Sequence, residues 1–116
     1  DADSVADALI TFEQSLVAPS RFDYYLLGDT HRLSAREIRG YRLFNDYGCI
    51  ACHQGQNIGG NMRQRFGILG DYYAGKAIRA GDLGYYQVSG DARDKYHFRV
   101  PSLRDVSRTA PYFHDG

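Results

Sequence analysis

The sequence is poor in several residues that often stabilise or anchor a small protein. It contains no tryptophan, one methionine, three prolines and only two cysteines among 116 residues. No apolar run approaches the ~18 residues that a membrane span requires, and the opening stretch DADSVADAL lacks the basic and apolar regions of a signal peptide. We therefore expect a soluble chain, with no membrane as partner, that is either mature or part of a longer protein.

Charge of one sign is also lacking. Lysine and arginine number 14 and so do aspartate and glutamate, which gives a formal net charge of zero. The chain thus carries no overall basic field of the kind that attracts nucleic acids or anionic membranes. Net charge by itself indicates no partner, and nucleic-acid binding is not expected.

Aromatic residues, by contrast, are plentiful. The chain has 10 tyrosines and 6 phenylalanines, together 14% of its residues. Aromatic rings bury a large area while tyrosine hydroxyls remain hydrated, so the rings either fill an ordinary core or line a flat prosthetic group. The length predicts one domain, residues 1–116, with a modest core.

The first part of the chain predicts two helical segments. Apolar residues at helical spacing predict an amphipathic helix from about Ser4 to Val17, which Pro19 ends. In the segment Ser20 to Asp29, the first serine is a candidate N-cap of a short helix or turn, and Gly28 closes it.

A clearer helix start follows. Ser34 and Glu37 have the spacing of a capping box, which predicts a helix from Ala35 to about Asn45. Gly40 within this helix has no side chain, so another backbone or helix could approach closely there.

The next region breaks into short pieces. Residues 56 to 95 show no sustained hydrophobic period and are interrupted by glycines, which predicts a long loop region organised by something other than its own core. The stretch Tyr72 to Ala80 has room for a turn or two. Gly59 and Gly60 either let the backbone lie against a bound ring or only form a turn.

The C-terminal stretch predicts one more short helix. Ser102 as a cap and Asp105 in the matching box position start it, and it ends before the last proline. Arg99 and Arg104 are candidates to hold a carboxylate bidentately; the alternative is a surface ion pair with Asp94 or Asp105. The pattern as a whole predicts a mostly helical fold of three to five helices with long loops.

The stretch GCIACHQG holds both cysteines and a histidine directly after the second. A zinc site would need four ligands, and the remaining histidines, His31, His97 and His114, are scattered along the chain. A thioredoxin-like dithiol would follow a strand in a βαβ pattern, which is not visible. The third interpretation, which we favour, is covalent haem attachment, because C-x-x-C-H is its local signature.

The spacing of this motif suits that chemistry. Positions i, i+3 and i+4 lie on one face of a helical turn, so Cys49 and Cys52 can bond the two haem vinyl groups while His53 reaches the iron. The other ring nitrogen of the histidine is then free to bond a backbone carbonyl. A haem that replaces much of the core would also explain the many tyrosines, and it predicts a cytochrome c-type fold around one covalent haem.

Beyond the motif, the chain resembles a known family over nearly its whole length. The stretches LSAREIRGYRLFNDYGCIACHQGQNIGGNMRQRFG and FRVPSLRDVSRTAPYFHDG resemble the C-terminal, electron-accepting haem domain of the bacterial di-haem cytochrome c peroxidases. The combination of C-x-x-C-H with a terminal TAPYFHDG is the most specific part. The resemblance implies one covalent haem c, an N-terminal haem domain as partner, and a small cytochrome or copper protein as electron donor.

The resemblance also implies a location and a second cofactor. The family is periplasmic, and peroxide is reduced at its N-terminal haem, so this domain would mainly transfer electrons. A calcium ion lies between the two domains of the family; backbone carbonyls, which suit this hard cation, would come here from Thr109 and Pro111.

The sixth iron ligand is the main departure from the family. Its methionine lies beyond the position of Gly116, so we expect either a piece of a longer di-haem protein or a stand-alone relative. Within the chain, Met62 is a candidate ligand or a loop residue, and His114 is a candidate ligand or a structural or interface residue. His31 and His97 are expected to be solvated surface histidines.

Three functions therefore remain open. The first is the electron-transfer domain of a di-haem peroxidase, and the second is a stand-alone mono-haem carrier or a cytochrome that binds peroxide or another small ligand. The third is part of a di-haem enzyme that oxidises protein side chains. If a partner domain is absent, the aromatic pair Tyr112 and Phe113 would be exposed and would favour self-association.

Overall fold

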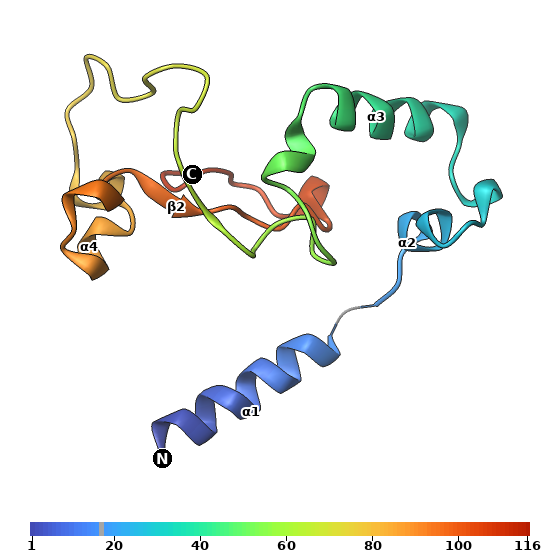
Figure 1. The fold of residues 1–116 in the computed structure, drawn as a ribbon, viewed down its shortest axis with the longest axis horizontal. Coiled ribbons are helices and arrows are strands. Elements are labelled where there is room, and N and C mark those ends of the chain that lie inside the picture. The colour runs from blue at the N-terminus through green and yellow to red at the C-terminus, as the bar shows by residue number, and fades with distance from the viewer. Residues whose placement is uncertain (17) are drawn as a thin grey trace. The chain divides into compact units, whose positions relative to one another are not determined.

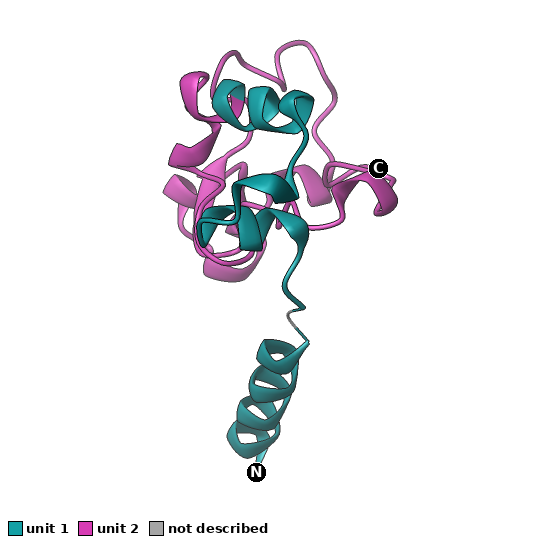
Figure 2. Cartoon of the chain, turned by 90° about the vertical axis from the view of Figure 1, so that its right-hand side faces the viewer, with its two compact units in different colours: residues 1–43 teal, residues 44–116 magenta. Residues whose placement is uncertain are grey.

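The computed structural model describes residues 1–16 and 18–116. The chain divides into two compact units, residues 1–43 and residues 44–116 (Figure 2). Figure 1 labels the longer helices and the strand β2 in chain order. Within the described residues, no helix is both long enough and apolar enough to cross a bilayer.

The first unit begins with helix α1, Ala2–Ser15. It starts two residues before the predicted position because the carboxylate of Asp1 accepts the backbone N–H of Ser4 at 2.9 Å and so caps the helix. The predicted end at Val17 lies outside the described residues. No residue of α1 is buried, and its apolar side chains remain exposed.

Helix α2, Arg21–Leu26, confirms the predicted cap. Ser20 and Asp23 form a capping box around its first turn, and Gly28 follows with φ 106°, a conformation that glycine adopts readily. A short 3-10 helix, η1 (Thr30–Arg32), leads to the next helix. The sequence predicts a short helix or turn here, and the structure contains the helix, with Asp23 as the second residue of its capping box.

Helix α3, Ala35–Asp46, begins at the predicted residue. The N–H of Ser34 donates to the Glu37 carboxylate at 2.8 Å, and the N–H of Glu37 donates back to the serine hydroxyl at 3.3 Å. The N–H and the hydroxyl of Ser34, which both donate to the carboxylate, and then Arg21, which lies 2.6 Å from it, lower the pKa of Glu37 to about 2. The close approach expected at Gly40 is not found among the described residues, since a Cβ there would meet nothing within 4 Å.

The second unit contains a two-stranded sheet that the sequence did not predict. Strand β1, Arg63–Arg65, pairs antiparallel with β2, His97–Arg99, and Arg63 lies opposite Arg99. Short helical pieces surround it: η2 (Cys49–Ala51), η3 (Ala80–Leu83), α4 (Tyr86–Ser89), η4 (Ala92–Asp94) and η5 (Val106–Arg108). The long glycine-broken segment is therefore ordered by a strand pair and single turns, and Tyr72 to Ala80 contains turns without a helix.

The predicted capping box near the C-terminus is wrong. The helix there is the short η5, which begins at Val106, and Asp105 precedes it in a left-handed conformation with φ 52°. The hydroxyl of Ser102 instead donates to the Asn57 carbonyl at 2.7 Å and accepts the N–H of Arg104. A bond to a distant loop thus replaces the local cap.

The glycine pair that follows the C-x-x-C-H turn lies against the chain's own backbone. Gly59 has φ 135°, and a Cβ there would fall on the carbonyl oxygen of Pro101. The N–H of Gly60 donates to the Val100 carbonyl at 2.7 Å. Gly59 is therefore required for the close approach of two backbone segments, whereas a Cβ at Gly60 would meet the side chain of Arg99.

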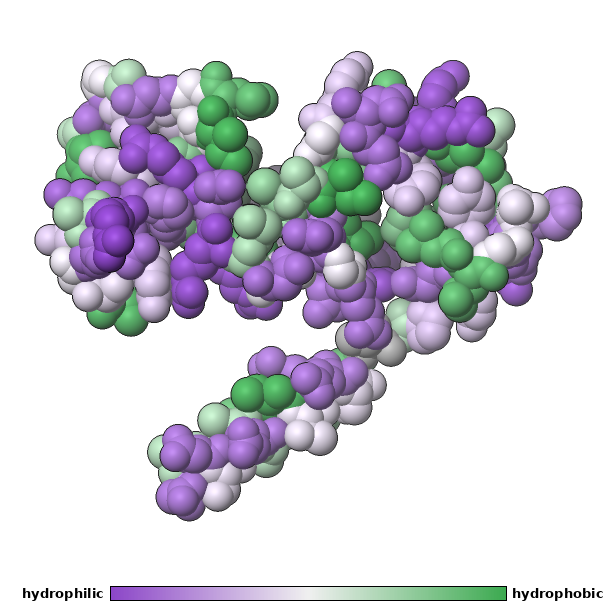
Figure 3. Space-filling view, viewed as in Figure 1, coloured by the Kyte–Doolittle hydropathy of each residue, from purple (hydrophilic) through white to green (hydrophobic). Residues whose placement is uncertain are grey.

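The described residues bury very little. Among the described residues, Gly59, Tyr73, Asp82 and Val100 are buried, while many large apolar side chains are exposed. Figure 3 shows apolar side chains at the surface, including on α1. The mostly helical fold with long loops is confirmed, and its polypeptide forms almost no hydrophobic core of its own.

Candidate functional site

The C-x-x-C-H stretch forms one turn of helix. Gly48 enters it in the left-handed conformation, with φ 75°. The carbonyl of Cys49 then accepts the N–H of Cys52 at 3.3 Å and that of His53 at 2.9 Å. This is the turn that the spacing predicts, and it leaves both cysteines as free thiols, the first exposed and the second half-buried.

The imidazole of His53 is held by a backbone acceptor. Its Nδ1 lies 3.3 Å from the carbonyl oxygen of Ile58, in the next loop, so this nitrogen carries the proton and Nε2 is free to bind a metal. A carbonyl partner of this kind orients a histidine ligand and raises its basicity. The structure thus contains the backbone bond that the sequence analysis expects for an iron ligand.

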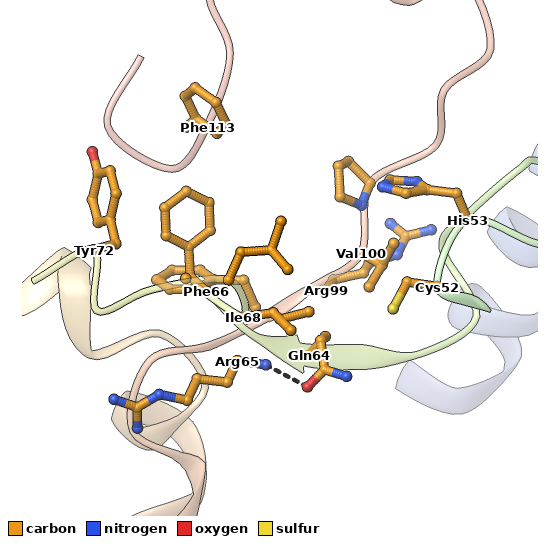
Figure 4. A pocket seen from close by; sticks show the side chains of 14 residues that line it. Cys52, His53, Gln64, Arg65, Phe66, Ile68, Tyr72, Arg99, Val100 and Phe113 are labelled. Carbon is orange, nitrogen blue, oxygen red and sulfur yellow. Dashed lines mark hydrogen bonds between the residues drawn. The ribbon is translucent and has the colours of Figure 1, made fainter. Parts of the chain in front are cut away.

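A cavity of about 590 Å³ lies beside this turn (Figure 4). Its walls come from the C-x-x-C-H turn, from β1 and the loop after it, from β2 and from the C-terminal segment. The lining residues are Cys52, His53, Gln64, Arg65, Phe66, Gly67, Ile68, Leu69, Tyr72, Phe98, Arg99, Val100, Pro101 and Phe113. The walls are mainly apolar, with a thiol and an imidazole together at one end.

The apolar side chains at the rim of this cavity are unusually exposed. Ile68 is 63% exposed, Leu69 104% and Phe113 74%, although apolar side chains that gather in one place normally mark a binding site. A flat apolar group would cover them, and Cys52 and His53 lie where a c-type haem would be attached. The residues present therefore fit a haem.

Aromatic rings form a large part of the cavity wall. The ring of Phe66 makes edge contacts with Tyr72, Phe98 and Phe113 at centroid distances of 4.6, 6.1 and 5.5 Å. Of all the described aromatic residues, only Tyr73 is buried. Phe66 and the three rings that it contacts line the cavity, an arrangement that favours a lining for a flat group over an ordinary core.

His114 is hydrogen-bonded to a buried aspartate and is not among the residues that line the cavity. Its Nε2 lies 2.7 Å from Asp82, and the two side chains are only 11% and 10% exposed. Asp82 also accepts the backbone N–H of Arg79 at 2.7 Å; this bond first, and then His114, lowers the pKa of the carboxyl. With its ring stacked 4.5 Å from Phe98, His114 has the structural role that was one of its two predicted roles.

Three other candidates are not among the residues that line the cavity. Met62 precedes β1, where its carbonyl accepts the N–H of Val100 at 2.9 Å, and it does not line the cavity; its role as a ligand stays a prediction. His31 is exposed, as expected. His97 is half-buried in β2, with Nδ1 3.2 Å from the Lys95 carbonyl, so the expectation of a solvated histidine is wrong there.

The two arginines singled out as carboxylate clamps donate to loop carbonyls. Arg99 reaches Gly60 at 3.2 Å and Arg104 reaches Gln56 at 2.7 Å. Arg99 forms no ion pair with an aspartate among the described residues. Its guanidinium lines the cavity, so a role toward a haem carboxylate stays a prediction.

The segment predicted to bind calcium has a tight conformation. The Ala110–Pro111 peptide bond is cis, and the hydroxyl of Thr109 donates to the Val106 carbonyl at 3.5 Å. The described part of the chain contains no group of three or more His, Cys, Asp or Glu side chains suited to a metal. A calcium site made of backbone carbonyls is a different arrangement, so that expectation stays a prediction.

The fold and the turn beside the cavity place the chain in the class of small, mostly helical proteins that carry a C-x-x-C-H motif. No family model matches the sequence. Among known proteins, it is 42% identical over 98% of its length to the cytochrome c peroxidase Ccp of Escherichia coli (strain K12). It is 43% identical, again over 98%, to the cytochrome c551 peroxidase of Pseudomonas aeruginosa.

The chain is thus a relative of the bacterial cytochrome c peroxidases, which confirms the resemblance predicted from its motifs. It spans 24% to 33% of the length of these relatives. The methylamine utilization protein MauG of Methylorubrum extorquens is 34% identical over 97% of the chain. The crystal structure of a MauG-like protein associated with microbial copper homeostasis matches 83% of the chain with a TM-score of 0.66 and 31% identity, over 31% of its own chain.

Proposed function

We propose that this chain is a c-type haem domain that transfers electrons within a di-haem cytochrome c peroxidase. The observation that carries the proposal is the orientation of His53, whose Nδ1 is held by the Ile58 carbonyl at 3.3 Å beside an apolar cavity. The preceding turn carries both cysteines, of which Cys52 lines the cavity. The named relatives support the peroxidase assignment.

Each residue of the turn has a separate task in this function. Cys49 and Cys52 would hold the haem by thioether bonds, and His53 would bind its iron. When bound, the haem supplies a reversible one-electron carrier. The chain itself fixes the tautomer of the histidine through Ile58 and excludes water with apolar walls, two factors that set the redox potential of such a site.

The remaining parts of the function concern other molecules. The partners would be an N-terminal haem domain and a small cytochrome or copper protein as electron donor, in the periplasm. Calcium would be held by the carbonyls of Thr109 and Pro111, and Met62 is the candidate sixth ligand that this chain offers. Among the described residues, no aspartate or glutamate lines the cavity, so its walls offer no pair of carboxyl groups for acid–base cleavage of peroxide.

A second candidate is a domain of a di-haem enzyme that oxidises protein side chains. The similarity to MauG, at 34% identity, and to the MauG-like structure favours it, although the peroxidases are more similar, at 41% to 43%. A stand-alone mono-haem carrier or ligand-binding cytochrome is a third candidate, to be separated by the state of the iron.

The test is to produce the chain in a host that matures c-type cytochromes and to stain a denaturing gel for haem. We expect haem to remain on the wild-type chain and to be lost from the Cys49→Ser/Cys52→Ser variant, with Gln54→Ala as a neighbouring control that keeps it. Visible spectra then separate a stand-alone carrier from a domain of a larger protein. A second ligand from the chain itself gives a low-spin iron and indicates a stand-alone carrier, whereas an open site gives a high-spin iron and indicates a domain of a larger protein. A wild-type chain without attached haem would refute the proposed function.

A further inference from the structure

The zero net charge of the chain conceals an uneven distribution. Between residues 60 and 104 there are eight arginines and lysines but only four aspartates and no glutamate. In contrast, the first 20 residues contain four acidic residues and no basic one. The whole second unit has nine arginines and lysines against seven aspartates, so its positive excess lies in the segment that contains the strand pair.

Three of the four aspartates in this region are engaged inside the unit. Asp71 accepts the backbone N–H of Tyr73 at 3.0 Å, and Asp82 is buried against His114. Asp91 pairs with Arg93 at 2.6 Å. Within the described residues, none of these carboxylates forms an ion pair with an arginine of β1.

The arginines of β1 are exposed and held in place. Arg63 and Arg65 are two positions apart, so they lie on the same face of the strand. The guanidinium of Arg63 lies 3.8 Å from the centre of the Tyr85 ring, and that of Arg65 lies 5.1 Å from the centre of the Tyr96 ring. A guanidinium held over a ring is preorganised, which favours binding of a carboxylate by its N–H groups.

The arginines of β1 also lower the stability of the sheet by charge repulsion, and packing within the unit does not explain their presence. Arg63 lies directly opposite Arg99 in the antiparallel pair, and like charges in that position destabilise a sheet. Lys95, which follows the fourth aspartate, Asp94, in the sequence, lies 5.1 Å from the centre of the Tyr86 ring. An uncompensated cluster of this kind is suited to charges from another molecule.

We propose that Arg63, Arg65 and Lys95 form a docking face for an acidic redox protein, the electron donor of the proposed function, on which this inference rests. Arg65 also lines the cavity (Figure 4), so a protein bound at this face would lie close to the haem site. Charge complementarity of this type steers association and makes it sensitive to salt. Donors with basic surfaces would be rejected.

The competing interpretation is that the arginines serve the haem carboxylates. It applies to Arg65, which lines the cavity, but not to Arg63, which does not. The single variant Arg63→Glu therefore separates a docking role from a role toward the haem.

The experiment measures binding of the purified, haem-loaded chain to immobilised plastocyanin, an acidic copper protein, and to mitochondrial cytochrome c, a basic one. We expect binding to plastocyanin at low salt that weakens as salt rises, and none to the basic protein. Arg63→Glu and Arg63→Glu/Arg65→Glu should weaken binding, the double variant by at least about tenfold. The matched control Arg36→Glu/Arg39→Glu, on α3, should change it less than about twofold.

Several outcomes would overturn the proposal. These are unchanged binding in the β1 variants, equal weakening in the α3 control, preference for the basic protein, or loss of haem from Arg63→Glu. Binding needs no electron transfer, so a chain without attached haem that still binds plastocyanin through Arg63 would refute the proposed function and leave this face intact. Circular dichroism of each variant shows that it is folded.

Discussion

At the scale of single residues, two histidines have different environments and hence different roles. The Nδ1–H of His53 donates to the Ile58 carbonyl, and the imidazole lines a cavity with its other nitrogen available. His114 uses Nε2 to bond a buried carboxylate, so that nitrogen is engaged. Residue type alone does not distinguish a ligand from a structural histidine, whereas the partner of each ring nitrogen does.

The buried pair makes a prediction about pH. The pKa of Asp82 is lowered by the Arg79 N–H and by His114, so the carboxylate stabilises the fold above the ordinary aspartate pKa of about 3.9, and this contribution disappears as pH falls through the lowered value. We expect Asp82→Asn to melt several degrees below wild type at pH 6, with the difference shrinking below about pH 4. Melting curves by circular dichroism measure it, and Asp7→Asn, an exposed aspartate of α1, should show no such difference.

At the scale of elements, capping determines where the helices of the first unit begin, and close backbone contact determines the path of the second. The capping boxes before α2 and α3 involve residues three positions apart. The strand pair joins segments distant in sequence, and Gly59 permits the contact with Pro101 next to it. We therefore expect the helices to be sensitive to substitutions at their caps, and the strand pair to be sensitive to substitutions where two backbone segments touch.

The cap of α3 makes a second prediction about pH. The backbone N–H and the hydroxyl of Ser34, followed by Arg21, lower the pKa of Glu37 to about 2. Ionised Glu37 therefore stabilises the helix above the ordinary glutamate pKa of about 4.3, and the contribution is lost as pH falls toward 2. Glu37→Gln should lower the melting temperature at pH 7 but not near pH 2. An equal loss at both values would contradict this role.

Two glycine substitutions test the packing at their positions. Gly59→Ala places a Cβ on the Pro101 carbonyl at positive φ, which we expect to cost at least about 2 kcal/mol from backbone strain and overpacking together. Gly40→Ala meets open space inside a helix and should stabilise the chain by up to about 1 kcal/mol. Denaturant unfolding of the two variants measures both, and a neutral Gly59→Ala would refute the close backbone contact.

At the scale of the whole molecule, the described residues of the second unit, taken by itself, bury too little apolar surface to explain a stable fold. Tyr73 and Val100 are its buried apolar residues, and the rim of the cavity is exposed. A large apolar ligand bound to the folded state would supply the missing contacts and would stabilise that state by mass action. We therefore expect a ligand in the cavity to take the place of a hydrophobic core.

Removing the haem should therefore unfold or loosen the chain. We expect the chain produced without cytochrome maturation, or as the Cys49→Ser/Cys52→Ser variant, to lose cooperative thermal unfolding and to bind a hydrophobic dye. The matured wild type should melt in one transition without dye binding. Calorimetry and dye fluorescence make the comparison, and an apoprotein as cooperative as the matured chain would show that the haem does not complete the core.

The sequence by itself determined the features that depend on near neighbours. The capping boxes of α2 and α3 and the turn that joins Cys49 to His53 all rest on hydrogen bonds between residues three or four positions apart, so their residues could be read directly. The predicted box at Ser102 failed because its hydroxyl bonds Asn57 across the loop, a partner that no local pattern indicates.

Only the tertiary structure decided what depends on the path of the chain. The β1–β2 pair, the bond between Asp82 and His114 across 32 residues and the gathering of arginines over tyrosine rings involve segments far apart in sequence. Composition sums the charges of the chain to zero, whereas in the fold Asp71, Asp82 and Asp91 bond groups of their own unit and Arg63 and Arg65 remain exposed. The physical reason is that long-range contacts depend on loop closure and packing, which periodicity and spacing do not encode.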